Sequence, residues 1–356
     1  MRIVFDVSPL SHPRTGVGNY VLGSLAGLAT AAAGRHELVA FAPATSRGRE
    51  AIEAALDGLD VERRLPVLPL AHGFRTLWSR IGRPPAERFV GRFDVLHFSD
   101  WMYPPQRAGL RSTMVHDLVP LRFPEWTERR TRSLHGTKYR ETARACDLVF
   151  VNSAYTGRDV VDVLGVPEER VRVAAPGVDS RFSQEGERAR LDRPYALTVA
   201  TLEPRKNLET LLDAAPLLPD ELVLAVAGGA GWGSQPALDR PRVQALGFVP
   251  DEELPRWYRG AAVLVVPSRF EGFGMTVVEA MACGTPCVVS SHPSLDEACG
   301  EAAVRFDPED PEALAAAVGD ALERRDELVA PGLEHARRFT WEACGRAMLE
   351  AYEAAL

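Results

Sequence analysis

The sequence predicts an α/β protein made of two doubly wound parallel sheets. Three observations lead to this fold class. At 356 residues, the chain is long enough for two domains. Short apolar runs typical of buried strands alternate with amphipathic helical runs through both halves. A polar stretch without periodicity, residues 180–193, separates the two series and is typical of a linker.

The first half contains six strand-like runs with helical patterns between them. The expected strands are residues 2–7, 37–42, 94–98, 112–116, 148–152 and 171–174. The clearest helical patterns cover residues 20–33 and 126–146. Pro176 and Gly177 then break the series. Strict alternation indicates that successive strands lie parallel, with helices covering both faces of the sheet.

The second half repeats this pattern. Its expected strands are residues 195–200, 222–227, 243–248, 262–266, 287–290 and 303–306, and its expected helices start at 208 and cover 275–282, 311–324 and 341–355. We therefore expect two Rossmann-like domains, 1–178 and 190–339, facing across a cleft. The carboxyl ends of the strands border that cleft, where ligands of this fold class bind. Residues 340–356 are expected to pack back onto the first domain.

Composition indicates an ordinary globular protein, because 46% of the residues are hydrophobic. No apolar run approaches the ~18 residues that a membrane span needs. The N-terminus carries Asp6 and no long apolar stretch, which is unlike a signal peptide. The five cysteines are odd in number and include no C-x-x-C pair, which indicates free thiols in a reducing compartment. These features predict a cytoplasmic protein.

Charge is distributed unevenly along the chain. Residues 1–178 hold 24 Lys and Arg against 19 Asp and Glu, whereas residues 179–356 hold 17 against 30. The opposite balance indicates that the two halves meet different partners. Only Lys138 and Lys206 are lysines, so the chain otherwise uses arginine for its positive charges.

The most informative segment is 271–279, Glu-Gly-Phe-Gly-Met-Thr-Val-Val-Glu, which follows an expected buried strand and opens a helix. The free N–H groups and positive dipole end of a helix start suit phosphate. Gly272 and Gly274 allow a ligand to approach the backbone. Glu279, about one turn into the helix, can reach ribose hydroxyls, and Glu271 can face the group beyond the phosphates. The alternative is a solvated loop Glu followed by an ordinary helix Glu.

Two adjacent cations, Arg205 and Lys206, follow the first strand of the second half and precede a helix. Cations at the carboxyl end of a strand can neutralise a diphosphate leaving group. Two solvated charges at a turn are the alternative. No D-x-D motif accompanies them at a strand end, because Asp6, Asp100 and Asp117 are isolated. We therefore expect no metal ion, and the leaving group's charge then falls to these two cations and to helix N–H groups.

Three further candidates follow strands of the first half. Gly16 and Gly18 allow close backbone approach, but Val21 occupies the third glycine position of a dinucleotide fingerprint, which disfavours NAD. His116 ends an expected strand and can face the cleft. A core histidine bonded to backbone is the alternative. Asp117 can orient the imidazole or contact an acceptor.

These segments resemble, in the same order along nearly the whole chain, the motifs of family 4 of the glycosyltransferases of GT-B fold. Residues 271–279 resemble the E-x7-E motif, and residues 200–207 resemble G-T-x-E-x-R-K-N. Ala200 stands where the family has Gly, which removes no ligand. Residues 15–20 are similar to T-G-[IV]-G-x-Y, and 116–125 to the H-D-x-x-P-L-x-x-P-E segment of mannosyltransferase-like members. Residues 247–249 resemble the family's G-x-V turn.

The resemblance implies a role for each candidate. Glu271 lies at the transferred sugar, and His116 contacts the donor sugar. Arg205 and Lys206 hold the diphosphate, and Glu279 binds the ribose. The remaining implied donor contacts come from residues near the phosphates, the sugar or the base: Gly16, Gly18, Phe248, Val249, Gly272, Phe273, Gly274 and Met275. The base is held through backbone groups, so the Phe248 side chain is expected in the core.

The resemblance also implies the reaction. A hexose, with mannose favoured by the H-D-x-x-P-L segment, moves with retention from a GDP- or UDP-sugar to a sugar, lipid-linked or small-molecule acceptor. Such transfer belongs to polysaccharide or glycolipid synthesis. No other cofactor and no nucleic acid is expected. Two alternatives stay open: a nucleotide-sugar epimerase of GT-B fold, and a non-catalytic nucleotide-sugar binding protein. A pyridoxal-phosphate phosphorylase is disfavoured, because it needs a Schiff-base lysine.

A basic stretch marks a further candidate surface. Residues 122–144 contain seven Lys and Arg against three Glu, with a few interleaved apolar residues. We expect this stretch to dock onto an anionic membrane surface or a lipid-phosphate acceptor, which would place the protein peripherally at the inner membrane face. The alternative is an ordinary surface helix with a basic face.

Overall fold

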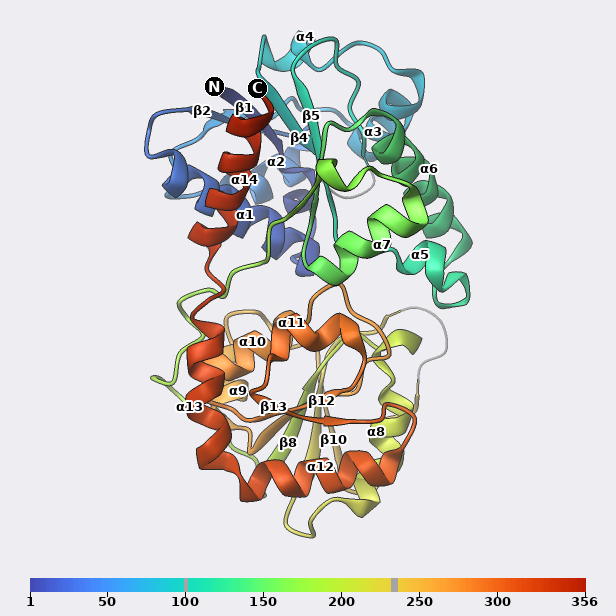
Figure 1. Cartoon of the computed structure of the whole chain (residues 1–356), viewed down its shortest axis with the longest axis vertical. Helices are drawn as coiled ribbons and strands as arrows, with labels where there is room; N and C mark the ends of the chain where they lie inside the picture. The colour runs from blue at the N-terminus through green and yellow to red at the C-terminus, as the bar shows by residue number, and fades with distance from the viewer. Residues whose placement is uncertain (99–101, 232–235) are drawn as a thin grey trace. The chain divides into compact units, whose positions relative to one another are not determined.

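The computed structural model describes residues 1–98, 102–231 and 236–356, which form two compact units (Figure 1). The first unit comprises Met1–Arg122, Arg129–Gly177 and Thr340–Leu356, and the second comprises Phe123–Glu128 and Val178–Phe339. Each unit contains one parallel sheet covered by helices. The predicted fold class, two Rossmann-like doubly wound domains, is therefore confirmed.

The first unit contains a seven-stranded sheet with strand order β3-β2-β1-β4-β5-β6-β7. Its strands are β1 (Arg2–Asp6), β2 (Glu37–Phe41), β3 (Glu62–Arg64), β4 (Val95–Phe98), β5 (Leu110–Val115), β6 (Leu148–Val151) and β7 (Val171–Val173). Six of these strands lie where the sequence predicts them. The sequence pattern does not predict β3, because Glu-Arg-Arg is polar. As an edge strand, β3 does not need the apolar faces of a central strand.

Helices cover both faces of this sheet. They are α1 (Gly16–Ala32), α2 (Ser46–Ala55), α3 (Ala71–Ile81), α4 (Glu87–Val90), α5 (Val119–Arg122), α6 (Arg129–Ala145), α7 (Ala154–Leu164) and α14 (Trp341–Ala355). Side chains of β1 alternate between the two faces, as they must in a strand. Ile3 and Phe5 belong to the core under α1 and α14, whereas Val4 belongs to the core that includes Trp78 of α3.

Glycines allow α14 to pack closely against α1. A Cβ on Gly27 would lie 1.7 Å from the Trp341 carbonyl oxygen, and one on Gly345 would lie 2.0 Å from the Gly27 carbonyl carbon. A Cβ on Gly23 would lie 2.1 Å from the Trp341 ring. Only glycine permits such an approach of two helix backbones. The C-terminal residues Thr340–Leu356 thus belong to the first unit.

A buried polar cluster joins α14 to the sheet. The Tyr352 hydroxyl lies 3.1 Å from His97 Nδ1 and 3.3 Å from Ser112 Oγ, and His97 Nδ1 lies 2.7 Å from Ser112 Oγ. Burial lowers the pKa of His97 to about 3, so this imidazole is neutral in the folded protein. These bonds satisfy the two hydroxyls and His97 Nδ1, whereas His97 Nε2 is buried without a hydrogen-bond partner among the described residues.

The second unit contains a six-stranded parallel sheet with strand order β10-β9-β8-β11-β12-β13. Its strands are β8 (Tyr195–Val199), β9 (Val223–Ala227), β10 (Val243–Gly247), β11 (Val263–Val266), β12 (Cys287–Ser290) and β13 (Ala303–Phe306). Its helices are α8 (Leu208–Ala214), α9 (Leu254–Gly260), α10 (Met275–Ala282), α11 (Asp296–Cys299), α12 (Pro311–Glu323) and α13 (Arg325–Ala336). The predicted strands are all present, within one or two residues at each end.

The polar stretch 180–193 contains no helix or strand but is held against the second unit. Arg259 donates hydrogen bonds to the carbonyls of Arg181, Ser183 and Glu187 over 2.8 to 3.4 Å. Phe182 is buried, and its ring lies 5.9 Å from that of Tyr258. This stretch is therefore a fixed part of the second unit.

The close approach of α1 and α14 leads to a stability prediction. Gly27→Ala forces the two helices apart, and we expect it to cost about 1–3 kcal/mol of unfolding free energy. Gly319→Ala in α12 is the control, because a Cβ there meets nothing within 4 Å. That variant should gain about 1 kcal/mol from helix propensity. Denaturant unfolding measures both, and equal stability of the two variants would contradict the packing account.

Candidate functional site

The strand order of the second unit identifies where a ligand site should lie. The order reverses at β8, whose neighbours β9 and β11 continue the chain in opposite directions across the sheet. In open parallel sheets, ligands bind at the carboxyl ends of the two strands at such a reversal. Here the loop after β8 carries Arg205 and Lys206, and the loop after β11 carries Glu271.

The loop after β8 has a locked backbone. Pro204–Lys206 form one 3-10 turn, and Asn207 adopts a left-handed conformation with φ of 53°. The buried Asn207 amide donates to the carbonyls of Pro267 (3.0 Å) and Pro308 (2.6 Å), which ties this loop to the end of β11. Asn207 thereby holds the two preceding cations in place.

Glu271 accepts hydrogen bonds from both cations. Lys206 Nζ and Ser268 Oγ each lie 2.6 Å from Oε1, and Arg205 Nη1 lies 2.6 Å from Oε2. The Glu271 backbone N–H donates to Ser294 Oγ at 2.9 Å. Glu271 is 7% exposed. Burial alone would raise its pKa, but Lys206 and Arg205 outweigh burial and lower the pKa to about 2. Glu271 is therefore a permanent anion.

A second carboxylate, which the sequence interpretation did not assign, completes the cluster. Glu203 is buried, and its Oε1 lies 2.9 Å from Arg205 Nε. Its Oε2 is buried without a hydrogen-bond partner among the described residues. With Glu203 and Glu271 ionised, the charges of Arg205 and Lys206 are balanced within the cluster. The sequence predicts cations that are available for phosphate, whereas in the structure both are paired with carboxylates. The motif G-T-x-E-x-R-K-N contains a Glu at the position of Glu203, and this match could have identified it from the sequence.

The glycine turn of 272–274 leads directly into α10, as the sequence predicts. Gly274 is the N-terminal cap, with φ of 107°, which favours glycine. Phe273 is buried, and its ring lies 5.1 Å from that of Phe339. Met275 opens the helix and is partly exposed. The first turn of α10 therefore starts beside the Glu271 cluster.

Glu279 lies in α10, one turn beyond Met275. Tyr258 donates its hydroxyl to Glu279 Oε2 at 3.0 Å, a partner that the sequence did not reveal. Burial raises the pKa of Glu279 to about 7, although the Tyr258 hydrogen bond acts in the opposite direction. The two glutamates of the motif thus differ in charge state: Glu271 is always ionised, and Glu279 titrates near neutral pH.

The turn after β10 corrects one expectation. The Phe248 side chain is 70% exposed, so it does not belong to the core. The reason is that β10 is the edge strand of the sheet, so within the described residues no further strand pairs with it on its outer side. Val249 is partly exposed. A Cβ on Gly229, two residues after β9, would lie 3.9 Å from Phe248 Cβ, so the Phe248 side chain lies beside this glycine.

In the first unit, Gly16 and Gly18 form the first turn of α1 instead of a separate loop. The Thr15 hydroxyl caps this helix by accepting from the Gly18 N–H at 3.4 Å. A Cβ on Gly16 would meet nothing within 4 Å, and one on Gly18 would only touch Leu10 and Thr15 at 4.0 Å. Packing inside the unit therefore does not require glycine at these two positions.

His116 follows β5 at the carboxyl edge of the first sheet. Its Nδ1 lies 3.4 Å from Asn152 Nδ2, and its ring meets Tyr20 edge-on at 5.0 Å. Burial, together with the nearby Lys138, lowers the pKa of His116 to about 3, so the imidazole is neutral. Its Nε2 is buried without a partner among the described residues. Asp117 Oδ1 accepts from the Val119 N–H at 3.0 Å, which caps α5.

The basic stretch 122–144 differs from its expected form. Lys138 is 2% exposed, and its Nζ donates to the Met114 carbonyl at 2.6 Å, so it is no part of a surface. Alternate faces of α6 point inward and outward, and Lys138 falls on the inner one. Arg122 pairs with Asp159, and Arg144 pairs with Glu141 at 2.5 Å.

No group of three His, Cys, Asp or Glu side chains suited to a metal ion occurs in the described ranges. Asp100 lies outside these ranges. No described helix is long and apolar enough to cross a membrane. All five cysteines are free and buried.

The contributions of the two motif glutamates to stability should differ in their pH dependence. The raised pKa of Glu279 means that the folded chain holds its proton up to about pH 7, whereas the unfolded chain releases it near 4.5. Its effect on stability is therefore lost as pH rises through this window. We expect Glu279→Gln to gain about 2 kcal/mol relative to the wild type between about pH 5 and pH 8.

Glu271→Gln is the matched control. Because the pKa of Glu271 is lowered to about 2, its contribution is already complete at pH 5. That variant should be destabilised by a constant amount across the same range. Denaturant unfolding at several pH values measures both, and parallel pH profiles would contradict the assigned charge states.

Comparisons with known proteins identify the family to which the chain belongs. The model of the family described as Glycosyltransferase Family 4 matches residues 15–182, and the model described as Glycosyl transferases group 1 matches residues 179–343. The O-antigen chain mannosyltransferase B of Escherichia coli is 29% identical over 388 residues, covering 99% of this chain and all of that protein. The D-inositol 3-phosphate glycosyltransferase of Geodermatophilus obscurus is 31% identical over 315 residues, covering 77% of this chain and 69% of the relative.

Solved structures share the fold over the whole chain. The Anabaena protein HepE in complex with UDP and glucose has a TM-score of 0.68 at 17% identity, covering 99% of this chain and 100% of that one. The sucrose-phosphate synthase of Thermosynechococcus elongatus has a TM-score of 0.68 at 20% identity, covering 99% and 98%. Two family models together span residues 15–343, and the relative of 31% identity covers 77% of the chain. The chain therefore belongs to the family 4, group 1 glycosyltransferases of GT-B fold.

Proposed function

We propose that this glycosyltransferase moves a hexose from a nucleotide-diphosphate sugar to an acceptor with retention of anomeric configuration. The observation that carries the proposal is the ion-pair cluster of Arg205, Lys206 and Glu271 beside the start of α10. It combines two cations, a buried anion and free helix N–H groups at the point where the strand order reverses.

The diphosphate would compete with Glu203 and Glu271 for the two cations, Arg205 and Lys206. Arg205 and Lys206 already neutralise Glu203 and Glu271, so a bound diphosphate shares these cations with the carboxylates. The N–H groups at the start of α10 supply further partial positive charge. No metal ion enters the proposal. Charge that develops on the leaving phosphate is met by groups that are already fixed in place, which is the efficient form of electrostatic catalysis.

Glu271 would orient the transferred sugar. Its carboxylate offers roughly four acceptor positions, of which three are used by Lys206, Ser268 and Arg205. One position remains for a sugar hydroxyl. With a pKa of about 2, Glu271 cannot act as an acid at neutral pH. Its role in the proposal is therefore to position C1 of the sugar and to fix the two cations.

Glu279 would bind the nucleotide ribose, and the turn at Phe248 and Val249 would hold the base. A ribose diol donates hydrogen bonds best to an ionised carboxylate. The exposed Phe248 ring offers an apolar face to the base, in addition to the backbone contacts that the family resemblance implies.

His116 would donate to or accept from the donor sugar. The support is its neutral imidazole with an unpartnered, buried Nε2, a polar atom that a sugar hydroxyl would satisfy. Gly16 and Gly18 keep the role implied by the family resemblance, backbone approach to sugar and acceptor. Packing within the unit does not require glycine at these two positions, which supports this role.

The comparisons support a hexose donor without naming its base. HepE structures with UDP-glucose favour a uridine nucleotide, and the similarity to a mannosyltransferase favours mannose, so both UDP- and GDP-sugars are candidates. Relatives named for O-antigen chains and for D-inositol 3-phosphate support a sugar or a phosphorylated small molecule as acceptor. A lipid-linked acceptor is the third candidate.

A nucleotide-sugar epimerase and a non-catalytic binding protein are the remaining alternatives. A pyridoxal-phosphate phosphorylase is disfavoured further, because Lys138 is buried against the Met114 carbonyl and Lys206 is bound to Glu271. Incubation of the protein with UDP- and GDP-sugars, with and without acceptor, separates the alternatives. We expect release of free nucleotide and a glycosylated product that keeps the donor's anomeric configuration, read by NMR.

Lys206→Ala is the paired variant in the same assay and should lose about 2–4 kcal/mol of transition-state stabilisation. Isomerised donor, or binding without turnover, would replace the proposal by one of the alternatives. Wild-type turnover of Lys206→Ala would remove this lysine from the diphosphate site.

The two glutamates should divide the work of binding and turnover. At pH 8, above the Glu279 pKa of about 7, Glu279→Gln is expected to weaken affinity for the bare nucleoside diphosphate about tenfold, because it removes a charged partner of the ribose. Glu271→Gln should lower kcat much more than that affinity, since its place is at the sugar. Calorimetric titration with UDP and GDP, together with initial rates, tests this. Equal loss of nucleotide affinity in both variants contradicts the division of roles.

A further inference from the structure

Helix α3 (Ala71–Ile81) presents an apolar stripe to solvent. Leu77 is 58% exposed and Ile81 is 59% exposed, and Leu70, which precedes the helix, is 81% exposed. Their spacing of seven and four residues places them on one side of the helix. Val67, just upstream, is 44% exposed. These four are four of the ten exposed large apolar side chains in the described parts of the chain. Such a concentration on α3 and the segment just before it indicates an interaction surface.

The opposite side of α3 anchors the helix firmly. Trp78 is 2% exposed and packs against Phe41, Phe74 and Phe89, with ring centroids 5.5 to 6.0 Å apart. Arg75, also on the inner side, is buried and donates to the Ser8 carbonyl at 3.3 Å. The exposed stripe is therefore held out from a packed core, and its exposure does not result from a loosely attached helix.

Arginines surround this stripe. Residues 63–92 contain seven Arg and a single acid, Glu87. Of these seven, Arg64 pairs with Glu62, and Arg75 is buried. Arg80, Arg83 and Arg88 are exposed. Within the described residues, no carboxylate lies within 4 Å of these three guanidinium groups. Their positive charge is thus unbalanced at the surface.

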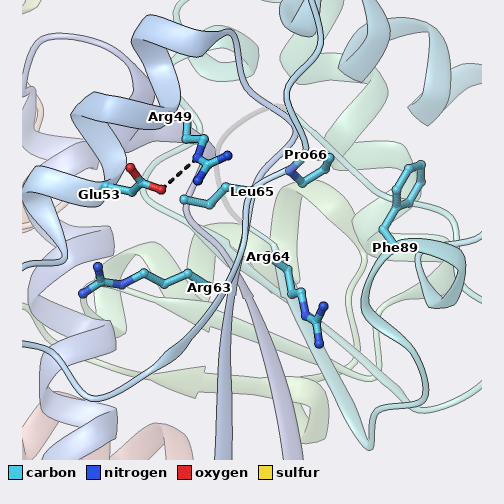
Figure 2. Close-up of a pocket in the computed structure, with 7 residues that line it drawn as sticks. All are labelled: Arg49, Glu53, Arg63, Arg64, Leu65, Pro66 and Phe89. Carbon is cyan, nitrogen blue, oxygen red and sulfur yellow. Dashed lines mark hydrogen bonds and ion pairs between the residues drawn. The ribbon is translucent and has the colours of Figure 1, made fainter.

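A hollow of about 340 Å³ continues the basic surface toward α2. Figure 2 shows Arg49 pairing with Glu53 on one side of the strand, while Arg63 and Arg64 point away from each other. Phe89 lines the hollow and packs against Trp78 of α3 at 5.5 Å, so the hollow and the stripe share one aromatic cluster. The guanidinium groups diverge, so they do not form a cradle for one phosphate. Diverging cations suit an extended anionic surface.

We propose that α3 docks this protein onto an anionic phospholipid surface. Leu70, Leu77 and Ile81 enter the boundary between headgroups and acyl chains, and the surrounding arginines contact lipid phosphates. An apolar stripe bordered by Arg is the pattern of a helix that lies in the plane of a membrane interface. The unbalanced charge favours a lipid surface over a second copy of this chain, whose total charge is −8 but whose α3 face would carry the same positive charge.

This surface replaces α6 as the main candidate for membrane contact. The described part of α6 has basic residues but no exposed large apolar side chain, and Lys138 is buried. The two surfaces are not far apart, since the Tyr103 backbone bonds to Ser79 of α3 and the charges of Arg80 and Arg140 both act on Tyr103. The inference does not rest on glycosyl transfer, because a lipid surface binds α3 whatever the reaction.

Vesicle sedimentation tests the proposal with the full-length protein. We expect the wild type to bind vesicles of phosphatidylcholine with phosphatidylglycerol at low salt, and to bind much less to pure phosphatidylcholine or at high salt. The double variant Leu77→Ser/Ile81→Ser should bind about tenfold less tightly. Its control is Leu217→Ser/Val163→Ser, which removes two apolar side chains of 52% and 43% exposure from other elements.

A charge pair of variants provides a second, independent readout. Arg80→Ala/Arg83→Ala should lower binding about tenfold at low salt and flatten the salt dependence. Arg337→Ala/Arg338→Ala, two exposed arginines of the second unit, is the matched control and should bind like the wild type. All four variants change exposed residues, so unchanged thermal unfolding and unchanged nucleotide affinity are expected throughout.

Three results would overturn the proposal. In the first, the wild type stays in the supernatant with anionic vesicles at low ionic strength. In the second, the α3 variants bind as tightly as their controls. In the third, light scattering finds a wild-type dimer that Leu77→Ser/Ile81→Ser converts to a monomer, which assigns the stripe to self-association. Nucleotide affinity, measured on the same samples, keeps any of these outcomes separate from a failure of the proposed function.

Discussion

The buried carboxylate of Glu271 is the charge on which the ligand edge of the second unit depends. Taking a carboxylate out of water is costly unless partners surround it, and here Lys206, Arg205 and Ser268 all donate to it. The same bonds fix the two cations. Asn207 also positions them, because its side-chain amide bonds their loop to the carbonyls of Pro267 and Pro308. Recognition of phosphate and orientation of the sugar thus arise from one arrangement, and loss of any member leaves a buried charge without its partner.

A second constraint acts on the first unit, where the chain ends meet. The glycine contacts of α1 with α14 require that the C-terminal helix return to the unit where the chain begins. The first turn of α1 carries Gly16 and Gly18, so the helix that receives α14 also presents one of the candidate ligand segments. The His97, Ser112 and Tyr352 cluster adds specific polar contacts to this packing. Folding of the C-terminal helix and shape of the candidate site are therefore coupled.

Periodicity was enough to predict the sheets, because central strands must be apolar on both faces and helices must cover them. It was not enough at the edges. The polar strand β3 and the exposed Phe248 both lie on edge strands, where burial no longer dictates residue type. Lys138 was expected at the surface, because the neighbouring residues in the sequence do not reveal that its ammonium donates a hydrogen bond to the Met114 carbonyl.

The same limit applies to the candidate site. The family resemblance implied that Arg205, Lys206 and Glu271 serve one donor site, and the structure shows that their loops follow the adjacent strands β8 and β11. It could not predict that Glu203 would balance Arg205, nor that Tyr258 would donate to Glu279, because both depend on distances across the fold. The stripe on α3 escaped notice for a related reason. Leu70, Leu77 and Ile81 have the spacing of a buried helix face, and only the fold reveals that solvent lies beyond them.

Charge distribution gives the two proposals a common physical basis. Residues 179–356 carry 30 acids against 17 basic residues, so an anionic donor meets an unfavourable field at long range. Its binding must then come from short-range contacts with fixed cations and helix N–H groups, which salt screens less than exposed pairs. The first unit shows the opposite arrangement. Its excess positive charge includes the exposed Arg80, Arg83 and Arg88 in and after α3, which suits long-range attraction to an anionic surface. In the two proposals, the second unit recognises the donor diphosphate through specific, short-range contacts. The first unit attracts lipid phosphates through nonspecific, salt-sensitive charge.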